Sequence, residues 1–469
     1  MPLTPAARSR VVFWATALGA MMTSLDLSIG NVALPSIARS FPDASASSLS
    51  WVLNAYTVVY GAMLITAGRL ADLRGVRRIY AAGVAVFTAS SLAITAAPTI
   101  GVLIAARAVQ GLGASLITPA SLAILIAAAH QSREVAVAKW STLHAVAVIL
   151  GPTLGGTLVA AGTWRAAFAI NVPIGIAVLV LVHRLVPEST VESHRQVDVL
   201  GAALICVAAA AGVGSLAELP RHGLGAPVVL TLIAVCLAAV AALTVHLRRH
   251  PDPVLDRDLL RSRWIQVTTL GTLAYSAGFF GLFTCSIVEL IHVWRYSDRA
   301  AGLSFTLGPA VVFFTARRFG RLATRTGTGP IIAVGGLLLA LGAWWALTFI
   351  GPTPQFFTGW LPGHLIVGLG VATAFTCLGA AAVIGVPQAR LSSATGLNQT
   401  ARQLGGAIGV ALVIGLIGNP LSDTAAGYRN AWIAVIVAML LSAVSGVWLT
   451  ALVRPRGDLV QGPPTDRAD

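Results

Sequence analysis

Charged residues are scarce in this chain of 469 residues: Asp, Glu, Lys and Arg together make up only 10%. Soluble proteins carry about 25% charged residues, so too few polar side chains are present to cover a water-soluble globule of this size. Hydrophobic residues reach 56%, and the mean hydropathy is +0.83. The composition argues against a soluble enzyme and indicates an integral membrane protein.

Cysteines and catalytic motifs are also sparse. The four cysteines, Cys206, Cys236, Cys285 and Cys377, each lie inside an apolar run, where a thiol behaves as a small hydrophobic side chain. Their spacing predicts neither a disulfide framework nor a metal site. The sequence has no P-loop, so ATP is not expected as the direct energy source. It also lacks the His/Glu cluster, Ser/Lys dyad or paired aspartates of an intramembrane enzyme.

Long apolar runs take up most of the chain. A helix needs about 20 apolar residues to cross the hydrocarbon core of a bilayer. Fourteen runs approach or exceed this length, and we predict that each spans the membrane: 11–35, 48–68, 78–97, 101–128, 137–161, 166–186, 198–217, 226–247, 264–291, 300–317, 329–350, 358–386, 396–418 and 429–453. The first run contains Asp26 and has no small-residue cleavage site, so we interpret it as a retained helix and not as a signal peptide.

The net charge of +14 is explained by basic loops at a membrane, without a nucleic-acid partner. With fourteen spans, both termini lie on one side. When residues at span ends are counted with the adjoining loop, six of the 31 basic residues lie on the other side and two lie well within spans, which leaves 23 on the side of the termini. Cytoplasmic loops are enriched in Arg and Lys. We therefore expect both termini to be cytoplasmic, in a multi-pass protein of the plasma membrane.

An internal repeat divides the chain. The sequence G-R-L-A-D-L-R-G at 68–75 returns as G-R-L-A-T-R-T-G at 320–327, and three further matches follow in order at similar offsets. Two related halves with a site at their interface are typical of secondary transporters. We predict six ranges: a cytoplasmic tail 1–10, a six-helix bundle 11–186, two additional helices 198–247, a cytoplasmic linker 248–263, a second six-helix bundle 264–453 and a cytoplasmic tail 454–469.

Several motifs resemble the major facilitator superfamily, in particular its fourteen-span drug:proton antiporter branch. They are L-D-L-S-I-G-N-V-A-L-P at 25–35, G-R-L-A-D-L-R-G-V-R-R at 68–78, R-A-V-Q-G-L-G at 107–113 and G-P-T-L-G-G at 151–156. The resemblance covers nearly the whole chain. It implies an all-α integral membrane protein with the major facilitator fold, two six-helix bundles plus two central helices. One departure concerns Glu289-Leu290-Ile291-His292, where the family usually has Tyr-Leu-Gln.

Ionisable side chains within the spans are the candidate functional residues, because each costs about 2.5–3.5 kcal/mol at the centre of a membrane helix. Only two acids lie well inside spans, Asp26 and Glu289. An antiporter needs a carboxylate that a proton and a substrate can each neutralise. We assign proton coupling to Asp26 and Glu289, and to Arg107 on the strength of the resemblance. A packing role is the alternative for Asp26, and a wetted position at the mouth is the alternative for Glu289 and His292.

Further polar side chains are candidates for the substrate cavity. Gln110 shares a helix face with Arg107, and Asn398 shares one with Arg402. The cavity candidates are Asn31, Tyr56, Gln110, Glu289, His292, Asn398 and Arg402. Candidates for gating are the loop residues Gly68, Asp72, Arg74, Gly75 and Arg78 and the residues Gly151, Pro152, Gly155 and Gly156. For these two groups, a positive-inside anchor and ordinary helix packing are the alternatives.

Together these features predict a proton-coupled exporter of small amphipathic or cationic compounds that works by alternating access. The proton gradient supplies the energy, and we expect no cofactor, no metal and a monomeric transport unit in the lipid bilayer. Export of a single endogenous metabolite or antibiotic, as in self-resistance, is an alternative that the sequence leaves open. A non-transporting membrane receptor is the alternative from another class, against which the buried ionisable residues of both halves argue.

Overall fold

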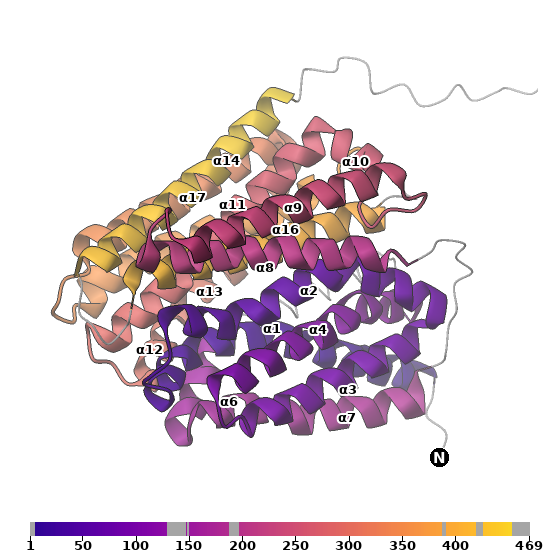
Figure 1. The fold of residues 1–469 in the computed structure, drawn as a ribbon, viewed down its shortest axis with the longest axis horizontal. Helices are drawn as coiled ribbons and strands as arrows, with labels where there is room; N and C mark the ends of the chain where they lie inside the picture. The colour runs from indigo at the N-terminus through magenta and orange to yellow at the C-terminus, as the bar shows by residue number, and fades with distance from the viewer. Residues whose placement is uncertain are drawn as a thin grey trace, which may run out of the picture.

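The computed structural model describes residues 5–128, 147, 150–186, 197–386, 391–418 and 425–452, and within these ranges the regular elements are all helices (Figure 1). Twelve of these helices are long and apolar enough to cross a membrane. The elements are α1 (Pro5–Ser40), α2 (Ala46–Arg74), α3 (Val76–Thr95), α4 (Ile100–Ala128), an apolar helix Leu150–Ala161, α6 (Trp164–Ala169), α7 (Asn171–Leu185), α8 (Val199–His222), α9 (Pro227–Arg249), α10 (Arg257–Arg261), α11 (Arg263–His292), α12 (Asp298–Ser304), α13 (Leu307–Thr326), α14 (Thr328–Phe349), a π-helical turn (Phe356–Trp360), α15 (Leu361–Ala381), α16 (Leu391–Ile417) and α17 (Ala425–Leu452).

The all-helical membrane class is confirmed, but the count of fourteen spans is not. Twelve predicted spans correspond to the twelve apolar helices among the described residues. The predicted span 137–161 lies partly outside the described residues, which here include the helix Leu150–Ala161. The predicted span 300–317 falls on α12 and on α13, whose sequence ends in an arginine-rich stretch, R-R-F-G-R-L-A-T-R-T, that lowers its hydropathy.

The helices pack as two bundles (Figure 1). We call the first, α1 to α7 with the helix Leu150–Ala161, the N-terminal bundle, and α11 to α17 the C-terminal bundle. Within the first, α4 packs on α2 and α3, and α7 packs on α1 and α3. Within the second, α11 packs on α16 and α17, and α14 packs on α15 and α17. Each bundle has its own buried apolar core, centred for example on Phe87 and Val84 in the first and on Leu339 and Met439 in the second.

The sequence predicts a loop at each copy of the repeated motif, but in the structure each copy forms the end of a helix followed by a glycine turn. Both α2 and α13 continue through most of the motif and end one residue before its last glycine, at Arg74 and Thr326. Gly75 and Gly327 have φ angles of 97° and 87°, which favour glycine because it lacks a Cβ. In each, the amide N–H bonds the carbonyl four residues earlier, and the next helix starts at once. The two halves therefore share this turn geometry at equivalent positions.

The two bundles contact each other at several positions. Along the middle of the molecule α2 packs on α16, where the Thr400 hydroxyl donates to the Gly61 carbonyl at 2.8 Å. At the end opposite to the basic residues Arg74 and Arg78, Arg39 and Asp298 form an ion pair at 2.7 Å. We call this the Arg39 end, and the end with Arg74 the basic end.

The predicted gating glycines lie where helices approach closely. A Cβ on Gly156 would lie 2.5 Å from the carbonyl oxygen of Asp298 and 3.3 Å from the Cα of Gly302 in α12. Gly151 faces Ser28 of α1, and Pro152 lies with its carbonyl against Gly302. A Cβ on Gly155 would lie 3.3 Å from the Cα of Ile29. The helix Leu150–Ala161 thus lies against α1 and α12 at once, near the Arg39 end.

The predicted additional helices form a hairpin beside the seam between the bundles. Helix α8 packs on both α2 and α16, and α9 packs on α8 (Figure 1). An apolar cluster joins them through Val58, Val213 and Ala407. Asp198 caps α8: its carboxylate accepts from the amides of Gly201 and Val254, each at 2.8 Å. Burial raises the pKa of Asp198, but these bonds and the one to His246 outweigh burial and lower it below its usual value.

The close contact between Gly156 and α12 predicts how a methyl group added at Gly156 affects closure of the Arg39 end. Gly156→Ala places a Cβ against a backbone carbonyl that cannot rotate away, and overpacking of this kind costs about 1–3 kcal/mol. The closed arrangement of this end should become about tenfold less populated. Disulfide formation between Thr153→Cys and Thr306→Cys, whose hydroxyls are 2.9 Å apart, measures this in a background without the four native cysteines.

Gly225→Ala is the matched control, because a Cβ on Gly225 meets nothing within 4 Å. It should leave the crosslinking rate unchanged. Equal rates in Gly156→Ala and the parent would show that this contact does not hold the end closed.

Candidate functional site

The carboxylate of Asp26 is the centre of a fully buried polar network in the N-terminal bundle. Asp26 and Arg107 each have 0% exposed side-chain surface, and Arg107 Nη1 lies 2.5 Å from Asp26 Oδ2. Gln110 Nε2 donates to Asp26 Oδ1 at 2.9 Å, and Asn171 Nδ2 donates to the same oxygen at 2.8 Å. A buried carboxylate needs this number of partners because no water replaces them.

Four helices supply the network. Asp26 lies in the middle of α1, Arg107 and Gln110 lie one turn apart on α4, and Asn171 is the first residue of α7. Ser91 of α3 accepts a further bond from Gln110 Nε2 at 2.8 Å. The i, i+3 spacing on α4 brings both of its side chains to the same carboxylate, as their shared helix face predicted.

Arg107 is held by more than the ion pair. Its Nε donates to the Val52 carbonyl at 3.0 Å, and its guanidinium lies over the rings of Tyr56 at 4.5 Å and Phe168 at 5.3 Å. Aromatic faces attract a cation that has been taken out of water. The Nη2 atom is buried and has no hydrogen-bond partner among the described residues. The Val52 carbonyl and the two rings would therefore still hold the Arg107 guanidinium if Asp26 were neutral. Its Nη2 group is also available to donate a further hydrogen bond.

Tyr56, which the sequence predicts to line the cavity, is fully buried in this arrangement. Its hydroxyl donates to the Thr23 carbonyl at 3.1 Å, and its ring supports Arg107. Tyr56 therefore contacts the Asp26 network through Arg107.

Asn31 links the two bundles. Its Nδ2 donates to the Leu27 carbonyl at 3.0 Å, within α1, and its Oδ1 accepts from Thr284 of α11 at 2.8 Å. Asn31 is 2% exposed. This contact lies between Asp26 and Arg39 on α1, so one helix carries the carboxylate and two contacts with the other bundle.

Glu289 lies apart from the Asp26 network, in the C-terminal bundle. It is 7% exposed, and its Oε2 accepts from Trp432 Nε1 of α17 at 3.0 Å. His292, one turn further at the end of α11, has its Nδ1 3.0 Å from the Val288 carbonyl of the same helix. Both side chains are buried in this arrangement.

The predicted polar face of α16 contacts α11 and α15. Asn398 donates to the hydroxyl of Thr272 at 2.7 Å. The guanidinium of Arg402 lies 4.1 Å from the ring centre of Phe375, and its Nε is buried without a hydrogen-bond partner among the described residues. Tyr275, whose ring lies 6.2 Å from that of Phe375, also has a buried hydroxyl without such a partner. Two polar groups close to one aromatic ring thus keep unused hydrogen-bonding capacity.

The charged gating candidates lie at the basic end. Arg74 and Arg78 are exposed, and Gly68 faces Pro119 of α4. Asp72 is in α2, and its side chain is outside the described residues. Arg69, a residue of the same motif, donates to the carbonyls of Asp252 and Pro253 at 3.1 and 2.7 Å. The motif therefore contacts the segment that links the hairpin to the C-terminal bundle.

Several partners were missed by sequence reasoning. Asn171 was not among the candidates, and Ser91, Thr284, Trp432 and Phe375 are common residue types in apolar spans. No spacing rule connects them to Asp26, Asn31, Glu289 or Arg402, because the partners lie on other helices.

The profile of the Major Facilitator Superfamily matches residues 16–410. The multidrug resistance protein Stp of Mycobacterium tuberculosis is 35% identical over 416 residues, which cover 87% of this chain and 76% of that protein. The methylenomycin A resistance protein of Streptomyces coelicolor is 30% identical over 94% of this chain and 93% of its own length. The cephamycin export protein of Amycolatopsis lactamdurans is 32% identical over 92% and 90%.

The fold has solved counterparts. A POT family transporter, solved in complex with 5-aminolevulinic acid, superposes with a TM-score of 0.67 over 94% of this chain and 96% of its own, at 14% identity. The sequence match and the two-bundle fold agree, and this multi-pass membrane protein belongs to the Major Facilitator Superfamily.

Proposed function

We propose that this protein is a proton-coupled exporter of small amphipathic compounds in the plasma membrane, working by alternating access with both termini in the cytoplasm. The observation that carries the coupling is the Asp26 carboxylate, buried and held by Arg107, Gln110 and Asn171. The export direction is supported by relatives named as resistance and export proteins. The basic end faces the cytoplasm in this proposal, following the positive-inside rule.

Protonation of Asp26 is the coupling step. A proton on Oδ2 removes the charge that holds Arg107 Nη1 at 2.5 Å. Removing one partner of a buried ion pair costs about 3–5 kcal/mol when nothing replaces it. Here the Val52 carbonyl, Gln110 Oε1 and the Tyr56 ring remain as partners of Arg107. They lower that cost enough for protonation to change the packing of α1 against α4 without unfolding the bundle.

Helix α1 conveys the change to the other bundle. It carries Asp26, then Asn31 bonded to Thr284, then Arg39 paired with Asp298. A shift of α1 after protonation therefore acts on both contacts. The close approach of Gly156 and Gly302 at the same end is the packing that must separate when this end opens.

The driving force is sufficient for export. A charge crossing a potential of 100 mV gains about 2.3 kcal/mol. Since 1.4 kcal/mol is a factor of ten, one proton exchanged for a neutral substrate holds a gradient of that substrate of roughly fiftyfold. No further cofactor is required.

The substrate contacts in this proposal come from the C-terminal bundle. Phe375 offers an aromatic face, and Arg402 and Tyr275 offer donors that have no hydrogen-bond partner among the described residues. Asn398 and Glu289 add polar groups on α16 and α11. This mixture suits planar molecules that carry a few polar groups.

Export of one antibiotic is a second candidate. The relatives include proteins named for methylenomycin A, cephamycin and lincomycin, each tied to a single compound or class. Expression in a drug-sensitive host and a susceptibility panel separates the two functions: protection against one chemical class supports this candidate, and protection against unrelated dyes and drugs supports the broad exporter.

Asp26→Asn should abolish proton-driven efflux. The amide keeps the shape and the acceptor oxygen but cannot exchange a proton, so dye efflux from everted vesicles should fall to the level seen after collapse of the proton gradient. Facilitated exchange of substrate without a gradient should persist. Asp43→Asn is the matched control, because Asp43 is exposed just after α1, and it should transport normally. Unchanged gradient-driven efflux in Asp26→Asn would refute the assignment.

Glu289→Gln tests whether the charge of Glu289 is needed for transport or only its hydrogen bond to Trp432. The amide oxygen can still accept from Trp432 Nε1, so the fold should persist. If Glu289 attracts cationic substrates, efflux of a cationic dye such as rhodamine 123 should fall about tenfold, and efflux of a neutral substrate should not change. An equal loss for both kinds of substrate would assign Glu289 to proton coupling. If efflux of neither substrate falls, Glu289 has a packing role only.

A further inference from the structure

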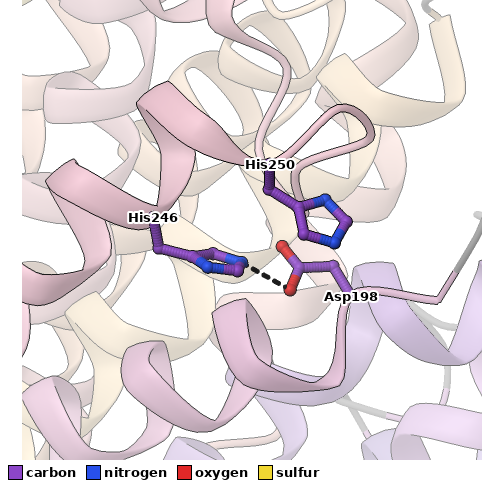
Figure 2. Close-up of side chains that lie close together, drawn as sticks. All are labelled: Asp198, His246 and His250. Carbon is purple, nitrogen blue, oxygen red and sulfur yellow. Dashed lines mark hydrogen bonds and ion pairs between the residues drawn. The ribbon is translucent and has the colours of Figure 1, made fainter.

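Three metal-ligating side chains meet at the ends of the α8–α9 hairpin, away from the Asp26 network. Asp198, His246 and His250 point toward one another (Figure 2), and one ligand atom from each lies within 4.8 Å of the others. His246 Nε2 is 2.8 Å from Asp198 Oδ1, and the two imidazole ring centres are 5.0 Å apart.

The fold explains why these residues meet. His246 and His250 are four residues apart at the end of α9, so they lie on one face a single turn apart. Asp198 is the N-cap of α8, and the hairpin brings this start of α8 beside the end of α9. The sequence showed no metal spacing because the third ligand lies 48 residues from the nearer histidine.

Neighbouring groups fix the orientation of the carboxylate and leave it able to bind. Asp198 Oδ1 accepts from the Gly201 amide, and Oδ2 accepts from the Val254 amide. Each carboxylate oxygen has two lone pairs, so these bonds do not exhaust its capacity. Such outer contacts are what orients the ligands in metal sites.

The histidines require a small rearrangement. A metal ion replaces the proton shared by His246 Nε2 and Asp198 Oδ1. The atoms then move from 2.8 Å to about 3.3 Å, the ligand separation around a tetrahedral zinc with bonds of about 2.0 Å. His250 Nδ1 accepts from the Asp252 amide at 3.2 Å, a long bond on a partly exposed side chain. Giving up this bond frees the His250 ring to close on the ion.

We propose that Asp198, His246 and His250 form a binding site for a divalent transition-metal ion of the zinc class, with water completing the coordination. Two imidazoles and one carboxylate are a ligand set that zinc, cobalt and nickel accept, whereas magnesium and calcium prefer oxygen ligands alone.

The bound ion would join the two ends of the hairpin. It would tie the start of α8 to the end of α9, next to the segment 252–254 that bonds both Asp198 and Arg69. Arg69 belongs to the repeated motif on α2. The site is therefore placed to stiffen the connection between the hairpin, the N-terminal bundle and the linker, and it does not depend on the proposed transport function.

Cobalt absorption tests the site directly. The full-length protein, purified in detergent without a histidine tag and stripped with chelator, is titrated with Co²⁺ while its visible d–d bands are recorded. We expect saturation at one ion per chain and displacement by Zn²⁺. His246→Gln and His250→Gln should each weaken binding at least tenfold, since loss of an outer contact alone costs 10–100-fold in metal affinity.

His222→Gln is the matched control. His222 lies at the other end of α8 and pairs with Glu218 at 3.1 Å, so it offers a similar His–carboxylate pair outside the cluster. Its affinity for Co²⁺ should equal that of the parent. If His222→Gln weakens binding as much as the other two changes, or if none does, the ion binds elsewhere and the proposal falls.

Thermal unfolding gives an independent readout. Added Zn²⁺ should raise the Tm of the parent protein and of His222→Gln, because a ligand that binds only the folded state stabilises it. His250→Gln, which leaves the cap bonds of Asp198 intact, should unfold at the parent's metal-free temperature and show no rise with Zn²⁺. A rise equal to the parent's, or no rise in the parent, would mean that the cluster is a hydrogen-bonded cap only.

Discussion

The buried pair of Asp26 and Arg107 is the interaction on which the N-terminal bundle depends. Two opposite charges with no exposed surface are stable only while each keeps its partners, because water cannot solvate an unpaired charge in the interior of a bilayer. Helices α1, α3, α4 and α7 each contribute a polar group to the network. Their relative positions are thereby fixed by one carboxylate, and its charge state is a property of the whole bundle.

The network lies entirely within one bundle, which constrains how a proton can be coupled to movement. No described residue of the C-terminal bundle bonds the Asp26 carboxylate. In the proposed mechanism, a change at Asp26 reaches the other bundle most directly through α1, which contacts that bundle at Asn31 and Arg39. The buried hydroxyl–amide bond at Asn31 is shielded from solvent, whereas Arg39 is 47% exposed and its ion pair is screened. The first contact is thus less sensitive to salt than the second.

Sequence reasoning predicted the parts of this arrangement that depend on periodicity and scarcity. Asp26 and Glu289 stood out because acids are rare in spans, and Arg107 and Gln110 were placed on one face by their spacing. It did not predict that Asn171 completes the network, since a partner 145 residues away follows from helix packing and not from any local pattern. It also treated residues 68–75 as a loop. The hydrophobic run ends near Gly68, but backbone hydrogen bonding continues the helix to Arg74, where Gly75 ends it.

The bonds that Asp198 makes have a consequence for how the two additional helices are attached to the rest of the chain. Its carboxylate bonds His246 at the end of α9 and the amide of Val254 just beyond it, so the chain enters and leaves the hairpin at nearly the same point. A segment whose ends meet can be gained or lost without moving what lies before and after it. The hairpin is thus arranged as an insertion between the two bundles, with both of its ends held at one carboxylate.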